Sequence, residues 1–256
     1  MPEQVRIPRV IHYVWFGHRP KGALLEHCMR TWVERLPGYT IIEWNEDNYS
    51  SVHPFFEQAC REQQFSFASD IARLDILYRH GGIYLDTDVE IKKNLDGFLR
   101  ARMFMGLEAD CFLGTSLIGA VAGHPLLKGL LGEYDNLAAG RYVVNNGILT
   151  RYLLRHYPEF RLVNRKQTLT GGIDIYPKEC FVMPPLFSAG GYARHHAVNS
   201  WQDKCQRPMV KRVANFLLGD ALYLHLAHHK SIRANEFYRI YRQHNPSIFG
   251  CKSSKG

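Results

Sequence analysis

Two aspartates, Asp86 and Asp88, directly follow the apolar run from Ile83 to Leu85. Alternation along a strand at about 3.3 Å per residue places both carboxylates on one side, about 7 Å apart, with Thr87 pointing away. Mg²⁺ and Mn²⁺ prefer oxygen ligands, and Mg²⁺ takes one or two carboxylates while keeping positions for water and phosphate oxygens. The pair is therefore predicted to bind one such cation beside a diphosphate, although an isolated Asp-x-Asp more often lies in a solvated turn.

Asp70 and Arg73 are three residues apart, so they share one face of a predicted helix. Apolar residues at helical spacing indicate this helix, namely Ile71, Leu74, Leu77 and Tyr78. Ser69 is predicted to cap its start and Gly81-Gly82 to end it. An exposed ion pair is the simple interpretation of Asp70 and Arg73, and a ligand site shared with the aspartates is the other.

The order Ser-Asp-x-x-Arg, apolar helix, Gly-Gly-x-Tyr-x-Asp-x-Asp over residues 69–88 resembles the sugar-binding region of glycosyltransferase family 32, shared in part with the clostridial glucosylating toxins. Residues 7–17 resemble the family's opening strand, and residues 28–47 its second βα unit. Residues 195–201 are similar to its His-His-aromatic-x-x-Ser-Trp signature, with Ala197 where an aromatic residue is usual.

The resemblance implies an α/β fold with a GT-A-like, Rossmann-type mixed sheet flanked by helices. It also implies a metal-dependent, retaining transferase that moves a hexose from a nucleotide-diphosphate sugar, with UDP favoured, to a glycan or lipid-linked acceptor. The expected context is bacterial capsule or lipopolysaccharide synthesis, and the expected cofactor is Mn²⁺ or Mg²⁺.

The resemblance also assigns roles to individual residues. Asp88 is expected to be the main metal ligand, Asp86 to contact metal or ribose, and His196, in preference to His195, to add a late metal or diphosphate contact. A packed His-His loop is the alternative for the two histidines. Asp70 and Arg73 would hold donor-sugar hydroxyls, so the expected catalytic residues are Asp70, Arg73, Asp86 and Asp88. The expected donor contacts also include Tyr84, Ser200 and Trp201.

The elements that position these residues follow the order of an α/β sheet. The apolar run Val10–Phe16 is typical of a parallel strand covered on both faces. Ligands of such sheets bind beyond the carboxyl ends of strands, so Trp15, Phe16 and Gly17 are expected near the nucleotide. Trp15 is expected to stack on the base, or else to be a core aromatic.

Further along the chain, the patterns predict helices over 24–36, 54–64 and 125–134, and strands over 39–44, 89–91, 104–107 and 116–121. Asn145-Asn146-Gly147 is expected to form a turn, or else to offer amides to sugar hydroxyls.

With 256 residues and 46% hydrophobic content, the chain can bury one large core. We expect a catalytic domain over 1–206 and a basic helical extension over 207–256. Residues 203–256 hold ten Lys/Arg and three Asp/Glu, which gives +7 of the net charge of +8. A solvated surface and an anionic membrane surface are the two main interpretations, and nucleic acid is disfavoured because no nucleic-acid motif is present.

The expected location is the cytoplasm, with attachment to the inner face of the plasma membrane, because no apolar run reaches the roughly 20 residues of a membrane span and no signal pattern is seen. A metal-dependent hydrolase built from His225, His228 and His229 with the His195-His196 pair is a weaker hypothesis, since no His-Glu-x-x-His helix occurs. A non-catalytic sugar-binding module is weaker still, because it would leave the four predicted catalytic residues unexplained.

Overall fold

The computed structural model describes residues 6–137, 142–183, 190–197 and 233–249. The predicted donor contacts Ser200 and Trp201 and the three histidines of the hydrolase hypothesis, His225, His228 and His229, lie outside the described residues.

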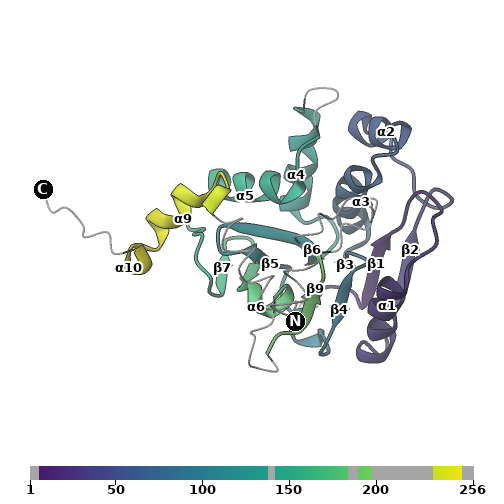
Figure 1. Cartoon of the computed structure of the whole chain (residues 1–256), viewed down its shortest axis with the longest axis horizontal. Coiled ribbons are helices and arrows are strands. Elements are labelled where there is room, and N and C mark those ends of the chain that lie inside the picture. The colour runs from purple at the N-terminus through teal and green to yellow at the C-terminus, as the bar shows by residue number, and fades with distance from the viewer. Residues whose placement is uncertain (1–5, 138–141, 184–189, 198–232, 250–256) are drawn as a thin grey trace, which may run out of the picture.

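A seven-stranded sheet with the order β2-β1-β3-β6-β5-β8-β7 forms the centre of the molecule (Figure 1). Its strands are β1 (Val10–Val14), β2 (Thr40–Trp44), β3 (Gly82–Leu85), β5 (Met103–Ala109), β6 (Phe112–Ala120), β7 (Gln167–Leu169) and β8 (Ile173–Tyr176). β1 pairs parallel with β2 and β3, whereas β6 is antiparallel to β3 and β5. β4 (Val89–Ile91) and β9 (Ala193–His195) form a separate antiparallel pair. The predicted mixed α/β sheet is thus confirmed.

Helices cover both faces of this sheet. The helices are α1 (Ala23–Arg35), α2 (Pro54–Arg61), α3 (Phe65–His80), α4 (Pro125–Asp135), α5 (Asn145–His156), α6 (Lys178–Phe181), α9 (Tyr238–His244) and α10 (Pro246–Phe249), with a 3-10 turn at Asp96–Phe98. Buried residues of α2 to α5 and α9 pack on one face, and those of α1, α6 and the β4–β9 pair pack on the other. The apolar runs predicted from the sequence form the strands of the sheet and the buried faces of the helices that pack on it.

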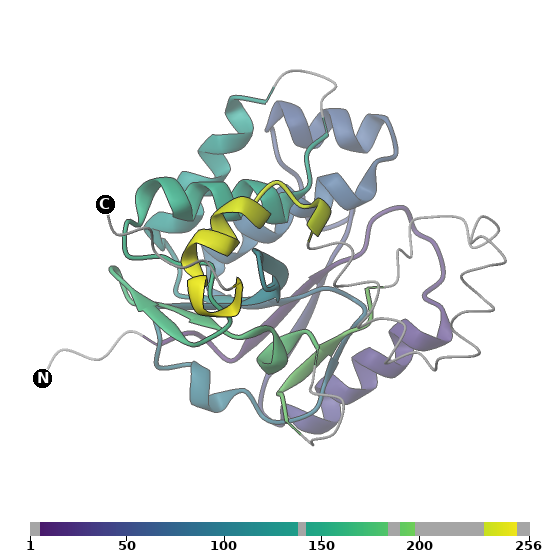
Figure 2. The ribbon, with the colours of Figure 1, turned by 60° about the vertical axis from the view of Figure 1, so that its left-hand side comes forward.

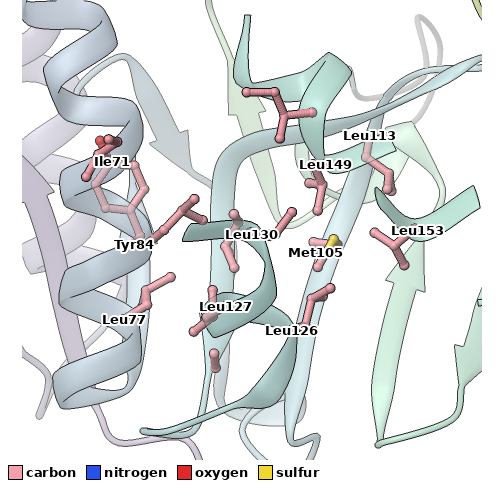
Figure 3. Packing of buried hydrophobic residues seen from close by; sticks show 14 of the residues in the cluster. Ile71, Leu77, Tyr84, Met105, Leu113, Leu126, Leu127, Leu130, Leu149 and Leu153 are labelled. Atoms are coloured by element: carbon pink, nitrogen blue, oxygen red, sulfur yellow. The ribbon is translucent and has the colours of Figure 1, made fainter. Parts of the chain in front are cut away.

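The strand β3 shows why the predicted runs are apolar throughout. Ile83 and Leu85 pack into the cluster on the α1 side, and Tyr84 packs into the cluster on the α3 side. Figure 3 shows Tyr84 beside Ile71 and Leu77 of α3. Since alternate side chains of a strand point to opposite faces, a strand covered on both sides needs apolar residues at every position.

The helix before the aspartates begins earlier than predicted. α3 starts at Phe65 after Gln64, and the Ser69 hydroxyl donates to the Ser66 carbonyl inside the helix instead of capping its start. Its end is as predicted: Gly81 and Gly82 have φ of +65° and +106°. A side chain at Gly82 would lie 2.7 Å from the Val10 carbonyl oxygen of the neighbouring strand, so glycine is required there for two reasons.

Two local predictions are wrong. β3 ends at Leu85, and Asp86 to Asp88 form a tight turn into β4, closed by the Val89 N–H donating to the Asp86 carbonyl at 3.0 Å. Strand alternation therefore does not set the spacing of the two carboxylates. Asn145-Asn146-Gly147 is the first turn of α5 and not a loop turn.

The described part of the C-terminal extension packs on the sheet domain. Phe237 and Tyr241 are buried in the same cluster as the residues of α5. The Asn245 amide donates to the Leu162 carbonyl at 2.7 Å. Figure 2 shows α9 lying along the layer that contains α5. None of the helices in the described ranges combines the length and apolar character that crossing a bilayer needs.

Candidate active site

A cleft of about 490 Å³ opens at the carboxyl ends of β1 and β3. It brings together side chains from six separate segments, including Trp15, Arg73, Asp86, Asp88, Asn146 and His195. In open α/β sheets this edge is where ligands bind, because the loops that follow the strands converge there. The Asp-x-Asp motif, which the sequence places directly after a strand, thus lies in this cleft.

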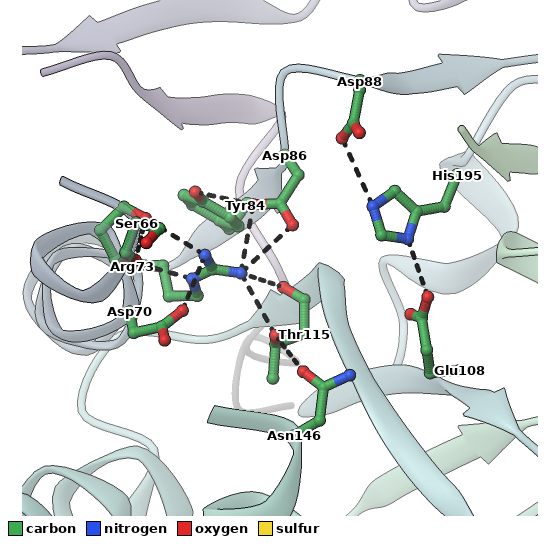
Figure 4. A network of polar contacts seen from close by, with 11 residues as sticks. Ser66, Asp70, Arg73, Tyr84, Asp86, Asp88, Glu108, Thr115, Asn146 and His195 are labelled. Carbon is green, nitrogen blue, oxygen red and sulfur yellow. Dashed lines mark hydrogen bonds and ion pairs between the residues drawn. The ribbon is translucent and has the colours of Figure 1, made fainter. Parts of the chain in front are cut away.

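Arg73 lies at the base of the cleft and is buried, with 5% of its surface exposed (Figure 4). Its Nη2 lies 3.0 Å from Asp70 Oδ1, and its Nη1 lies 3.1 Å from Asp86 Oδ1. Nη1 also donates to the Thr115 carbonyl at 3.0 Å, and Nε donates to the Ser69 carbonyl at 3.2 Å. The guanidinium thus holds both aspartates in place, which is not the exposed ion pair of the simple interpretation.

Asp70 and Tyr84 complete this buried charge network. Burial raises the pKa of the Asp70 carboxyl to about 7 against the opposing charge of Arg73. The Arg73 guanidinium lies 4.8 Å from the centre of the Tyr84 ring, and the Tyr84 hydroxyl donates to Asp86 Oδ1 at 3.0 Å. Asp86 is therefore oriented by two groups at the same oxygen, Oδ1: the guanidinium of Arg73 and the hydroxyl of Tyr84.

Asp86, Asp88 and His195 form a group whose ligand atoms lie within 4.8 Å of one another. Asp88 is 7% exposed, and its Oδ1 lies 3.4 Å from Nε2 of His195. Carboxylate oxygens suit Mg²⁺ and Mn²⁺, and an imidazole nitrogen is a common ligand of first-row transition metals. The three side chains therefore fit a divalent cation.

The histidine of this group is not the one favoured by the sequence. His196 Nε2 lies 3.1 Å from Glu90 Oε2, on a different carboxylate, while its backbone N–H donates to the Asp88 carbonyl. Burial lowers the pKa of the His196 ring despite the contact with Glu90. The structure therefore supports His195, rather than His196, as the third residue of the cation site.

Glu108 is a site residue that the sequence analysis missed. Its Oε1 lies 2.9 Å from His195 Nδ1, so the ring of His195 lies between Glu108 and Asp88 (Figure 4). Burial opposes a charge on this ring, but the negative charge of Glu108 and the hydrogen bonds to both carboxylates raise the pKa of His195 well above its usual value. Glu108 lies in strand β5 without a recognisable motif, so the sequence offered no signal for it.

Asn146 also lines the cleft, at the start of α5. Its Oδ1 accepts a hydrogen bond of 2.9 Å from the Thr115 hydroxyl, which is itself 3.2 Å from Arg73 Nη1. This bond fixes the amide so that its NH₂ group is left as the donor end. Although this segment is helical, the NH₂ group of Asn146 lies in the cleft as a donor for a ligand, as in the second interpretation of the sequence.

The expected nucleotide contacts directly follow the end of β1. Trp15 and Phe16 line it, but Phe16 is 7% exposed and packs against Tyr49 and Phe56. The Trp15 Nε1 donates to the Arg19 carbonyl at 2.7 Å, which fixes the orientation of the indole. At Gly17, where φ is +89°, an added Cβ would lie 2.6 Å from the ring of Phe65.

Residues 22–105 match the model of the family described as "Glycosyltransferase sugar-binding region containing DXD motif". Inositol phosphoceramide mannosyltransferase 3 of Schizosaccharomyces pombe is 24% identical over 130 residues, which are 49% of this chain and 36% of that protein. Inositol phosphoceramide mannosyltransferase 1 of the same organism is 32% identical over 132 residues, 44% of this chain and 40% of that protein. The chain thus matches about two fifths of the length of these relatives.

Among solved structures, the one described as PaToxG Glycosyltransferase superposes with a TM-score of 0.50 and 18% identity, covering 60% of this chain and 70% of that chain. This likeness supports the GT-A-like fold. Together with the family match, which contains Asp70, Arg73, Asp86 and Asp88, it confirms the resemblance predicted from the sequence.

Proposed function

We propose that this chain, whose residues 22–105 belong to the family of DXD-containing glycosyltransferase sugar-binding regions, is a metal-dependent glycosyltransferase. It transfers a hexose from a nucleotide-diphosphate sugar to a glycan or lipid-linked acceptor. The observation that carries this proposal is the group of Asp86, Asp88 and His195 at the wall of a cleft whose base is the Asp70–Arg73–Asp86 network.

Asp86, Asp88 and His195 would hold Mn²⁺ or Mg²⁺ next to the diphosphate. When bound, the cation neutralises the charge that develops on the diphosphate as the bond between sugar and phosphate breaks. Arg73 and the Tyr84 hydroxyl both hold Oδ1 of Asp86 and so fix the orientation of this carboxylate in the cleft. Preorganised charges of this kind stabilise the transition state because they need no rearrangement during the reaction.

The sugar would lie against Asp70 and Asn146. Asp70, held by Arg73, would accept hydrogen bonds from sugar hydroxyls, and Asn146, whose Oδ1 is held by the Thr115 hydroxyl, would donate through its NH₂ group. The N–H groups of Arg73 already donate to protein oxygens. In this proposal Arg73 therefore affects sugar binding mainly by holding Asp70 in position. The base would stack on Trp15, at the end of β1.

We further propose that transfer retains the anomeric configuration. The support for retention is the resemblance of residues 69–88 to glycosyltransferase family 32, which implies it. A front-face attack, in which the leaving phosphate oxygen takes the proton of the acceptor hydroxyl, balances without a covalent nucleophile. The bond to the acceptor oxygen forms on the face of the sugar that the diphosphate leaves.

The acceptor is proposed to be lipid-linked and the enzyme to work at the cytoplasmic face of a membrane, in surface polysaccharide synthesis. Two observations support a lipid-linked acceptor: the names of the relatives contain a phosphoceramide, and residues 203–256 carry a charge of +7. Arg233, Arg239 and Arg242 of this segment are exposed. Each basic residue near an anionic leaflet contributes about 1 kcal/mol. The names of the relatives also make mannose a hexose to test.

The test is a donor screen. The purified chain is incubated with UDP- and GDP-linked hexoses and Mn²⁺, and release of the nucleotide diphosphate is measured with and without chelator. We expect one donor to be hydrolysed in the presence of Mn²⁺ and not in excess chelator, and the Asp88→Asn variant to be inactive. Equal turnover by that variant, or full activity with chelator, would contradict the proposal.

A further inference from the structure

We propose that Glu108 is a positioning residue that fixes the ring of His195 so that Nε2 faces Asp88 and the cation. This inference rests on the proposed metal site, and it concerns a residue outside the family match at 22–105.

The contact between Glu108 and His195 joins two distant strands. Glu108 lies on β5 and His195 on β9, 87 residues apart, and Oε1 lies 2.9 Å from Nδ1. The side chains are 17% and 15% exposed, respectively. A hydrogen bond in such a sheltered place is shielded from competing water, so it can hold the ring in one orientation.

The local structure of β5 directs Glu108 into the cleft. The pairing of β5 with β6 shifts register on both sides of Leu107, and such irregularities bend a strand and re-aim its side chains. On the neighbouring strand, Gly114 makes room for the carboxylate, since a Cβ there would lie 2.8 Å from Glu108 Oε2. A larger residue at position 114 would push the carboxylate away from its present place.

The chemistry of the ring gives this contact its function. A histidine that binds a metal does so through the nitrogen without a proton, and its other N–H usually donates to a carboxylate or carbonyl. Glu108 accepts at Nδ1, so Nε2, the atom 3.4 Å from Asp88, is the nitrogen that loses its proton to solvent and offers its lone pair when a cation binds. Glu108 thereby selects the tautomer that can bind the cation.

The environment of Glu108 argues against a purely structural role. Its Oε2 is buried without a hydrogen-bond partner among the described residues. Burying a carboxylate is costly unless it is paired, and the pairing that the described structure provides is the one with His195. Since an apolar side chain would avoid this cost, we infer that the carboxylate serves the histidine.

The test measures Mn²⁺ affinity directly, by electron paramagnetic resonance of free Mn²⁺ in titrations of the full chain. Glu108→Ala should weaken binding about 10- to 100-fold, the usual effect of removing an outer partner of a metal ligand. Glu108→Gln keeps an acceptor for Nδ1–H and should stay within about threefold of wild type. Glu90→Ala is the matched control, because Glu90 contacts His196 in the same way and should change affinity less than about twofold.

The outcomes are distinguishable. If wild type binds Mn²⁺ and Glu108→Ala binds it equally well, the positioning role is wrong while the metal site stands. If Glu108→Gln is as weak as Glu108→Ala, the effect is one of charge and the positioning role is again wrong. If wild type binds no Mn²⁺, both the site and this inference fail.

Folding is checked by circular dichroism and thermal melts. Should Glu108→Ala not fold, Glu108→Asp replaces it, since it keeps the charge but is one methylene too short for the 2.9 Å contact. We expect about tenfold weaker binding from that variant, and wild-type affinity would overturn the inference.

Discussion

Replacing Arg73 by lysine keeps the positive charge but removes the planar fork that joins Asp70, Asp86 and Thr115. An ammonium group is a single point on a flexible chain, so it cannot bridge two carboxylates on opposite sides and a carbonyl as well. The variant therefore tests whether the geometry of the guanidinium, and not merely its charge, holds the site together.

The expected loss of stability follows from the contacts. We assume that lysine retains one carboxylate partner and leaves the other, which is 13–24% exposed, without its charge-assisted hydrogen bond. Such a bond contributes about 1.5–3 kcal/mol, and the lost stacking of Arg73 on Tyr84 adds roughly 0.5–1 kcal/mol. The free energy of unfolding should thus fall by about 2–4 kcal/mol, a large part of the total of about 5–15 kcal/mol that domains possess.

The assay is urea unfolding followed by circular dichroism, together with donor hydrolysis. Arg79→Lys is the matched control on the same helix, because Arg79 pairs with Asp75 at the surface, where its side chain is 54% exposed. That change should alter stability by less than about 0.5 kcal/mol. If Arg73→Lys also stays within this limit and turns over donor at the wild-type rate, the network does not organise the site and our reasoning is wrong.

Three further predictions concern the cation, pH and the membrane. Asp88→Asn should weaken Mn²⁺ binding at least about tenfold and abolish donor hydrolysis, and unchanged binding would contradict the ligand assignment. Burial lowers the pKa of His12 to about 4 from 6.5. The unfolded chain therefore gains a proton first as pH falls below 6.5, and stability should drop by about 3 kcal/mol by pH 4, at about 1.4 kcal/mol per pH unit. His12→Gln should flatten this dependence in urea unfolding at several pH values, and an equal slope would refute it. The chain should co-sediment with anionic vesicles at low salt and be released at 1 M salt, with Arg239→Gln/Arg242→Gln weakening the binding; failure to bind at low salt would leave the basic segment a solvated surface.

Paired substitutions suit the membrane test better than truncation before the last helices. Removing residues beyond 219 would take away Phe237 and Tyr241, which are buried in the main core. Exposing the apolar surface of two aromatic residues costs several kcal/mol, about 3–5 kcal/mol for a buried phenylalanine. A truncated chain would therefore confound loss of charge with loss of fold.

The sheet and its helices could be predicted from the sequence because each buried element has a periodic apolar pattern. The apolar run at β1, the stripe of α3 and the glycines that end α3 all follow from local physical chemistry. The start of α3 could not be predicted in this way. Ser69 has the side chain of a capping residue, but Phe65 and Phe67 pack against the main core, and this tertiary contact extends the helix by one turn.

The turn at Asp86 to Asp88 also depends on tertiary structure. The Asp86 N–H donates to the Ser116 carbonyl of β6 at 2.8 Å, after which the chain leaves the main sheet and pairs with β9. Neither the spacing of the two aspartates nor the alternation of side chains along a strand predicts that the chain leaves the main sheet here. The carboxylates converge because the chain turns between them, and their common partner comes from a strand more than 100 residues later.

The choice between His195 and His196 is the clearest limit of sequence reasoning, because the two are adjacent and of the same type. His195 is the last residue of β9 and His196 directly follows it, and the pairing of Val89 with His195 sets which histidine faces which carboxylate. A shift of that register by one residue would exchange them. In the observed register, His195 contacts Asp88 and Glu108 while His196 contacts Glu90, so the composition of the proposed cation site depends on the β4–β9 pairing. Glu108 contacts His195 and Glu90 contacts His196. Replacing each glutamate in turn therefore tests which of the two histidines binds the cation.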